Sequence, residues 1–275
     1  MIYLVLALAS SLTIAILLRW VERRELSRLV VVTCNYITAG ILALGGGSGR
    51  GEPLPVDVTV VGVGLGGLFL AGFLLFGLAM RREGMAAAVT MGRISLILPV
   101  AVAVGFFGET PGIADAAALI MIVVVFWAWE GGQRRVAPIL LALFLLFGAM
   151  NATMKWFAAV HPNVPESRFL TLVFLSALVC GGMVLAVNRQ RIRAIELVTG
   201  LVLGVPNYYA SFFLVRALER LPAFVVFPVV DTGVILLSTL AGVLLFGERP
   251  GRRKMVCIGF AAAAIIVLGL SRGNV

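Results

Sequence analysis

Two charged residues stand inside long apolar stretches of this sequence, where ionised side chains are unusual. Arg93 lies in "TMGRISLILP" and Asp231 lies in "FPVVDTGVIL". An arginine can hold a carboxylate or a phosphate through two parallel hydrogen bonds, and an aspartate can bind an ammonium group or carry a proton. The two residues could therefore hold the charged ends of a small molecule, or they could bind each other.

A second set of candidate residues offers hydrogen bonds and aromatic faces. Six such residues lie near the middle of apolar stretches: Asn35, Tyr36, Asn151, Asn207, Tyr208 and Tyr209. Three of them belong to "GVPNYYASF", in which Pro206 removes a backbone donor and frees a carbonyl. These side chains could contact a ligand, or they could join neighbouring helices through hydrogen bonds.

The composition identifies the surroundings of these residues as a membrane. Of the 275 residues, 61% are hydrophobic and 13% are charged, whereas a soluble domain has roughly 45–50% apolar and about 25% charged residues. The apolar residues come in blocks of about 20, which is the length that crosses a hydrocarbon core. Because lipid cannot satisfy the backbone of an open sheet, we expect an all-α integral membrane protein.

These blocks predict ten transmembrane helices. Their approximate ranges are 2–20, 28–46, 56–80, 84–107, 112–130, 136–159, 168–188, 195–217, 222–246 and 254–271. Arginine and lysine are concentrated in the loops after the first, third, fifth, seventh and ninth spans. Since the side richer in these residues is cytoplasmic, we expect a multi-pass protein of the cell (inner or plasma) membrane with both termini outside.

The net charge of +9 does not indicate nucleic acid as a partner. The basic residues form short clusters between the apolar blocks, a placement that fits helix ends near anionic headgroups. The expected partners are the lipid bilayer and a small-molecule substrate, and the expected oligomeric state is either a monomer or a homodimer.

The chain also repeats itself at a nearly constant distance. Four matches lie 136 to 140 positions apart: "GETPG" at 108–112 with "GERPG" at 247–251, Gly62 and Gly66 with Gly200 and Gly204, "RW" at 19–20 with "KW" at 155–156, and Arg28 with Arg168. The repeat predicts two units, residues 1–134 and 135–275, with five spans each. Because five is odd, the second unit enters the membrane inverted, which is the plan of many secondary transporters.

With its two five-span halves and a glycine–glutamate turn after the fourth span of each, the chain resembles the drug/metabolite transporter superfamily, and most closely its EamA-like branch. The resemblance implies a ten-helix transporter with a central cavity lined mainly by spans 1–4 and 6–9. It also implies movement of a small polar or amphipathic metabolite, such as an amino acid or a related compound, by alternating access.

The repeat brings the two charged residues close to equivalent positions. Asp231 falls opposite Gly92, one position from Arg93. Each ionised residue at mid-membrane costs about 2.5–3.5 kcal/mol on insertion scales, or roughly 5–7 kcal/mol for both. Two readings follow: a salt bridge that holds the halves together, or a cavity pair that faces the substrate. Both hold if the pair opens during the transport cycle.

Other patterns argue against enzymatic chemistry. "GVGLGG" at 62–67 matches a dinucleotide fingerprint in letters, but it lies inside a span, where glycines four apart serve helix packing. "DTG" at 231–233 lacks the second mid-span carboxylate that an aspartic protease needs. We therefore expect no enzyme, no cofactor and no metal site, with coupling to protons or a counter-substrate left open. The alternatives are a non-transporting membrane scaffold or partner subunit and, after it, an intramembrane enzyme.

Two further expectations concern helix ends and kinks. Lys155 and Trp156 are expected to anchor the end of a span at the interface, with the lysine amine reaching the headgroups. Pro99 and Pro228 lie in the same spans as Arg93 and Asp231, so we expect kinks near the charged pair.

Overall fold

The structure is a computed structural model that describes residues 2–46, 53–83, 85–129 and 137–246, together with residues 256, 259–260 and 262–264. All regular secondary structure in these ranges is helical. The helices are α1 (Ile2–Arg23), α2 (Arg28–Gly46), α3 (Val56–Glu83), α4 (Met85–Ile94), α5 (Ile97–Phe107), α6 (Ile113–Trp129), α7 (Pro138–Val160), α8 (Glu166–Val187), α9 (Ala194–Leu218) and α10 (Ala223–Phe246). Twelve of the eighteen residues of the predicted span at 254–271 lie outside the described residues.

The helix boundaries follow the apolar blocks of the sequence closely, with one correction. The predicted span at 84–107 is not one helix but two, α4 and α5, which are separated at Ser95 and Leu96. Pro99 explains the interruption, because its ring has no N–H to donate and would collide with the carbonyl of the residue four positions earlier. By contrast, α10 continues through Pro228.

Seven of the described helices are long and apolar enough to cross a membrane: α1, α2, α3, α7, α8, α9 and the part of α10 from Ala223 to Ala241. The helices α4, α5 and α6 are shorter. These lengths and compositions identify an α-helical, multi-pass membrane protein.

The chain forms two compact units. Unit 1 consists of Met1–Ala71 and Trp156–Glu219, and unit 2 consists of Gly72–Lys155 and Arg220–Val275. Each unit therefore combines segments from both predicted repeats, and α3 and α7 each contribute to both units. A compact unit and a sequence repeat are different divisions of a chain, so the repeats at 1–134 and 135–275 remain a prediction.

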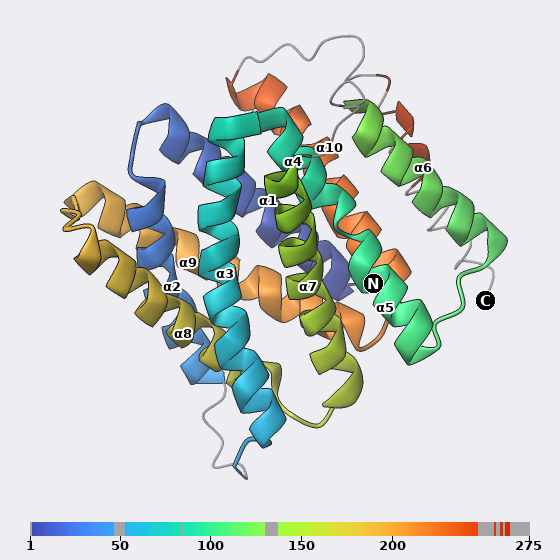
Figure 1. Cartoon of the computed structure of the whole chain (residues 1–275), viewed down its shortest axis with the longest axis horizontal. Coiled ribbons are helices and arrows are strands. Elements are labelled where there is room, and N and C mark those ends of the chain that lie inside the picture. Colours follow the sequence, from blue (N-terminus) through green and yellow to red (C-terminus); the bar gives the residue numbers. More distant parts are fainter. Residues whose placement is uncertain are drawn as a thin grey trace. The chain divides into compact units, whose positions relative to one another are not determined.

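In unit 1, α2 lies alongside α8 and α9 (Figure 1), and glycines bring the helix backbones close together. A methyl group added at Gly200 of α9 would overlap the Cys34 side chain of α2, and one at Gly204 would overlap the carbonyl oxygen of Asn35. These contacts confirm that the glycines spaced four apart serve helix packing.

The first half of α3 packs on α8 in the same manner. A methyl group at Gly62 would press against Leu172, and one at Gly66 would overlap the carbonyl oxygen of Val173. The α2/α9 and α3/α8 crossings thus join the same kinds of surface. A methyl group at Gly204 would have Asn35, Thr38 and Ala39 as its three nearest neighbours, and one at Gly66 would have Val173, Ser176 and Ala177. Each residue of the first set lies 138 positions before one of the second set.

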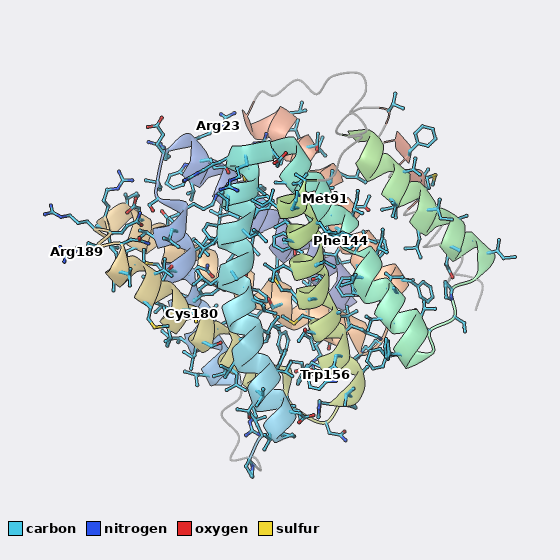
Figure 2. All side chains as sticks on the ribbon, viewed as in Figure 1. Arg23, Met91, Phe144, Trp156, Cys180 and Arg189 are labelled. Atoms are coloured by element: carbon cyan, nitrogen blue, oxygen red, sulfur yellow. The ribbon has the colours of Figure 1, made fainter. Side chains whose placement is uncertain are left out.

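In unit 2, α7 supplies the core. Leu140 and Leu143 are fully buried together with Ala79 of α3 and Ala88 of α4. Met91 of α4, which packs against this cluster, and Phe144 of α7 are labelled in Figure 2. The Phe147 ring lies close to Gly92 of α4, so this helix is held against α7 one residue before Arg93.

Candidate functional site

The charged pair predicted from the sequence is formed within unit 2. The Arg93 guanidinium donates from Nη1 to the Asp231 Oδ1 atom at 2.6 Å. The side chains are 30% and 16% exposed, respectively. The contact therefore offsets part of the cost of placing each charge at mid-span, and it is too poorly screened by water to be treated as a surface ion pair.

The local backbone places Arg93 in the last turn of α4, immediately before the interruption. There the chain makes short turns: the Leu96 N–H donates to the Arg93 carbonyl at 3.2 Å, and the Leu98 N–H donates to the Ser95 carbonyl at 3.0 Å. Hydrogen bonds to the third preceding residue give a 3₁₀-like geometry. The Ser95 hydroxyl also donates to the Gly92 carbonyl at 2.7 Å, so the interruption has its own hydrogen bonds.

Two further polar residues of unit 2 are near this region in sequence or packing. Asn151 lies on α7 one turn after Phe147, and no hydrogen bond to its amide is found within the described part of the chain. Thr232 follows Asp231, is fully buried, and has a hydroxyl oxygen with no hydrogen-bond partner among the described residues. Thr232 could not be predicted as a site residue from the sequence, since a threonine inside an apolar helix gives no distinct signal.

The neutral candidates of unit 1 form a second group around two amides. Asn35 donates from Nδ2 to the Val32 carbonyl in its own helix. Asn207 of α9 donates from Nδ2 to Asn35 Oδ1 at 2.6 Å. Asn35 is buried, whereas Asn207 is half-buried. The α2/α9 crossing therefore carries an interhelical amide pair next to the Gly204 contact.

The tyrosines that follow these two amides in the sequence pack against other aromatic rings. The Phe174 ring of α8 stacks with Tyr36 at 6.2 Å between centroids and meets Tyr208 edge-on at 6.5 Å. Tyr209 instead stacks with Phe213 at 5.6 Å. Five of the eight candidates thus lie in unit 1 (Asn35, Tyr36, Asn207, Tyr208 and Tyr209), and three lie in unit 2 (Arg93, Asn151 and Asp231).

The expectation for Lys155 is wrong. Its side chain is only 8% exposed, and its Nζ atom pairs with Glu109 Oε1 at 2.6 Å. Glu109 also accepts the Ala223 N–H through Oε2 at 2.8 Å, which caps the start of α10. A buried carboxylate attracts the amine more strongly than the headgroup region would, since both charges are otherwise unpaired in a low dielectric.

Glu109 belongs to the "GETPG" turn, which the sequence analysis used only as a repeat marker. Gly108 ends α5 with a positive φ of 66°, a conformation that glycine adopts without strain. This bend presents Glu109 to Lys155 and to the first turn of α10. The recurrence of the turn was the available signal, but a repeat alone does not name the partner.

The ends of unit 1 are held by similar charge pairs. Glu196 in the first turn of α9 accepts the Ser27 N–H at 2.9 Å and pairs with Arg193. This carboxylate raises the pKa of the Arg193 guanidinium above its ordinary value by hydrogen bonding. Arg216 pairs with the buried Glu166 at 2.6 Å. These contacts connect the start of α9 to the residue before α2, and the end of α9 to the start of α8.

The described residues contain no group of three or more histidine, cysteine, aspartate or glutamate side chains placed to hold a metal ion. Cys34 and Cys180 are free thiols, and Cys257 lies outside the described residues. His161 pairs with Asp57 at 2.9 Å at the helix ends. The absence of a cofactor and of an enzymatic activity remains a prediction.

The fold and these helices define an α-helical multi-pass membrane protein. No family model matches the chain. The chain is 23% identical over 282 residues to a protein of Haemophilus influenzae described only as uncharacterised, with 96% of each chain covered. It is also similar to a solved structure, described only as a crystal structure of a protein, with a TM-score of 0.78, 16% identity and coverage of 99% of this chain and 97% of that one. This similarity concerns the fold alone.

Proposed function

We propose that the protein is a secondary transporter that moves a small polar or amphipathic metabolite, such as an amino acid, across the membrane by alternating access. In this proposal the chain has two inverted five-span repeats, as in the drug/metabolite transporter superfamily and its EamA-like branch. Two inverted halves can exchange conformations and so open a central site to each side in turn.

The observation that carries the proposal is the matched pair of helix crossings in unit 1. Gly62 and Gly66 of α3 meet α8 at the positions that correspond, 138 residues apart, to those where Gly200 and Gly204 meet α2. Unrelated glycine motifs would have no reason to select corresponding partner residues. A duplicated unit inserted in both directions produces this correspondence, because each contact between the halves then occurs twice.

Two other contacts join residues that are themselves 138 positions apart. Tyr36 stacks with Phe174 in unit 1, and Arg93 pairs with Asp231 in unit 2. In an inverted repeat, each repeat takes the conformation of the other during the transport cycle. A contact between two equivalent positions then involves the same two residues before and after this change. Such a contact can be kept in both conformations of an alternating-access cycle.

The exact equivalence of Arg93 and Asp231 refines the alignment that placed Asp231 opposite Gly92. The turn motifs at 108–112 and 247–251 lie 139 positions apart, whereas Arg93 and Asp231 lie 138 apart. The stretch from Arg93 to Gly108 is therefore one residue shorter than the stretch from Asp231 to Gly247. The 3₁₀-like turns at Ser95–Leu98 account for it, because such turns rise about 2.0 Å per residue rather than about 1.5 Å. A shorter stretch then spans the same depth.

This equivalence favours a salt bridge between Arg93 and Asp231 that stays closed during transport, rather than a pair that opens in every cycle. Separating the two charges would restore much of their insertion cost of roughly 5–7 kcal/mol. A zwitterionic substrate could replace the ion pair without leaving a charge unpaired, since its carboxylate would bind Arg93 while its ammonium group bound Asp231. An anion or a cation alone would leave one of the two charges unpaired.

The test is a metabolite comparison followed by uptake measurements. Mass spectrometry of cells with and without the protein identifies compounds whose distribution between cell and medium changes, and vesicles containing the purified protein are then tested for their uptake. We expect saturable uptake that requires no ATP. A protein with no effect on any compound, and with no uptake, would contradict the proposal and favour a scaffold.

A further inference from the structure

The two equivalent crossings of unit 1 share their packing but not their chemistry. At the α2/α9 crossing, Asn207 donates to Asn35. The corresponding positions at the α3/α8 crossing hold Phe69 and Val173. Burial also corresponds, since Val173 is buried like Asn35, and Phe69 is half-buried like Asn207. The α3/α8 crossing therefore serves as an internal control for what the fold alone requires.

That control shows that close packing at this crossing does not depend on amides. Gly66 approaches the α8 backbone with apolar residues at the matching positions, as closely as Gly204 approaches α2. An interhelical hydrogen bond between membrane helices also contributes little stability on average. The amides at α2/α9 thus call for a role other than holding the helices together.

The hydrogen bonds also determine which way the amides face. Asn35 uses Nδ2 to donate to the Val32 carbonyl, so its Oδ1 is the atom that faces α9. This acceptor requires Nδ2 from Asn207, and Asn207 Oδ1 is left as an acceptor. Within the described residues no donor reaches that oxygen, and Asn207 is half-buried rather than enclosed.

An amide oxygen without a donor is unfavourable against hydrocarbon, because an unpaired polar group there loses its hydrogen bonds with water. It is favourable where a ligand brings an N–H or O–H group. The rings of Tyr36, Phe174 and Tyr208 are buried against one another, so the partly exposed Asn207 is the group that offers a polar atom to a ligand.

We infer that Asn207, oriented by Asn35, is a substrate-recognition residue of the proposed transporter that accepts a hydrogen bond from an N–H or O–H group of the substrate. The inference rests on the proposed function and assigns substrate recognition to the neutral group of unit 1. The shared ligand chemistry is the hydrogen-bond donor, whether ammonium or hydroxyl.

The experiment uses Asn207→Leu with Phe69→Leu as its matched control, since the two variants place leucine at corresponding positions. A compound found by the metabolite comparison is tested for uptake into vesicles beside an analogue whose donor group has been methylated. We expect the wild-type protein and Phe69→Leu to prefer the donor-bearing compound about tenfold, as a lost hydrogen bond to a charged or buried group implies. Asn207→Leu should lose this preference.

A second variant separates the two kinds of donor and guards against misfolding. Asn207→Asp keeps an acceptor oxygen at nearly the same size, adds a negative charge, and removes the Nδ2 that donates to Asn35 Oδ1. It should improve uptake of a compound with an ammonium donor and weaken uptake of one with a neutral hydroxyl donor. The folded state of each variant is checked by its melting temperature and elution profile in detergent.

The outcomes separate this inference from the proposed function. If the wild-type protein moves no compound, the transporter proposal fails. If it does transport, but Asn207→Leu keeps the wild-type preference for the donor, or Phe69→Leu loses it equally, the assignment of Asn207 is overturned while transport stands. Should Asn207→Leu fail to fold, Asn207→Asp takes its place: wild-type uptake of both the ammonium compound and the hydroxyl compound by this variant would overturn the assignment.

Discussion

The charged group of unit 2 and the amide group of unit 1 solve the problem of polar atoms in a membrane differently. Arg93 and Asp231 neutralise each other, and in the proposed repeat they occupy equivalent positions. Asn35 and Asn207 do not correspond to each other, and their counterparts are apolar. If the proposed repeats exchange conformations, the contact between Arg93 and Asp231 can be kept. The amide pair, by contrast, gives the α2/α9 crossing a chemistry that the α3/α8 crossing lacks.

The largest effect is expected when one partner of the charged pair is removed. Arg93→Ala leaves a largely buried carboxylate without its cation; a fully buried one typically costs about 3–5 kcal/mol, so we expect a loss near the lower end of that range, and uptake should be abolished. The exchanged pair Arg93→Asp with Asp231→Arg should recover both stability and transport. If the two positions are equivalent, swapping the charges lets the same ion pair form again. Melting temperatures and vesicle uptake measure the two effects.

Failure of the exchanged pair to transport, in a protein of normal stability, would contradict the bridging role and favour direct substrate binding. Asp231→Asn is the partner control, since it leaves the arginine without a carboxylate.

Removing the other buried ion pair of unit 2 should affect stability without altering selectivity. Lys155→Met leaves Glu109 buried beside the first turn of α10 and should destabilise the protein by about 3 kcal/mol. Adding Glu109→Gln should recover part of this loss, since the amide can still accept the Ala223 N–H. Unfolding of the four members of this mutant cycle measures the coupling. Equal losses in the double variant and in the sum of the single variants would show that the pair contributes nothing.

Methyl groups at the two crossings should have intermediate and closely similar effects. Gly66→Ala and Gly204→Ala each force a helix away from a neighbouring backbone and should each cost about 1–3 kcal/mol. Gly64→Ala is the matched control, because a methyl group there meets no atom within 4 Å. This substitution should be neutral or slightly stabilising, since alanine favours the helix. Melting temperatures in detergent provide the measurement, and a tolerated Gly66→Ala beside a damaging Gly204→Ala would break the equivalence.

The smallest effect on stability is expected at the amide pair. Asn207→Leu should change the free energy of unfolding by only about 0.6 kcal/mol, the average for a hydrogen bond between membrane helices. Chemical unfolding of the variant in detergent, compared with Phe69→Leu, gives the value. A loss as large as that of Arg93→Ala would show that the amides hold the fold, and would remove the distinction between the two groups.

Prediction from the sequence succeeded where a property is local along the chain. The apolar blocks predict the described helices within a few residues, since a block of this length must satisfy its own backbone in lipid. The charged pair could be predicted for a different reason. The predicted repeat places Arg93 and Asp231 at nearly equivalent positions, and equivalent positions of an inverted repeat can meet. The sequence predicted only a kink near Pro99, and not the interruption at Ser95–Leu96, because a proline in a sequence does not show whether the helix bends or breaks.

Side-chain partners were harder to predict. Lys155 was assigned to the interface because lysine near the end of an apolar run commonly extends to the headgroups. Its true partner, Glu109, lies in a turn 46 positions earlier in the sequence, and nothing in the local pattern of either residue indicates the other. Phe174, which contacts both Tyr36 and Tyr208, was missed because a phenylalanine in an apolar helix has no distinctive neighbours in the sequence.

By itself the sequence determined that the chain is helical, spans a membrane several times, and carries two opposite charges and a set of amides within apolar segments. These properties follow from hydropathy and helical period, which depend on neighbouring residues. Only the tertiary structure decided that Arg93 meets Asp231, that Asn207 donates to Asn35, and that Lys155 is buried against Glu109. Those pairings depend on which helix faces lie together, and they are favoured because a polar group inside a membrane is stable only beside a partner.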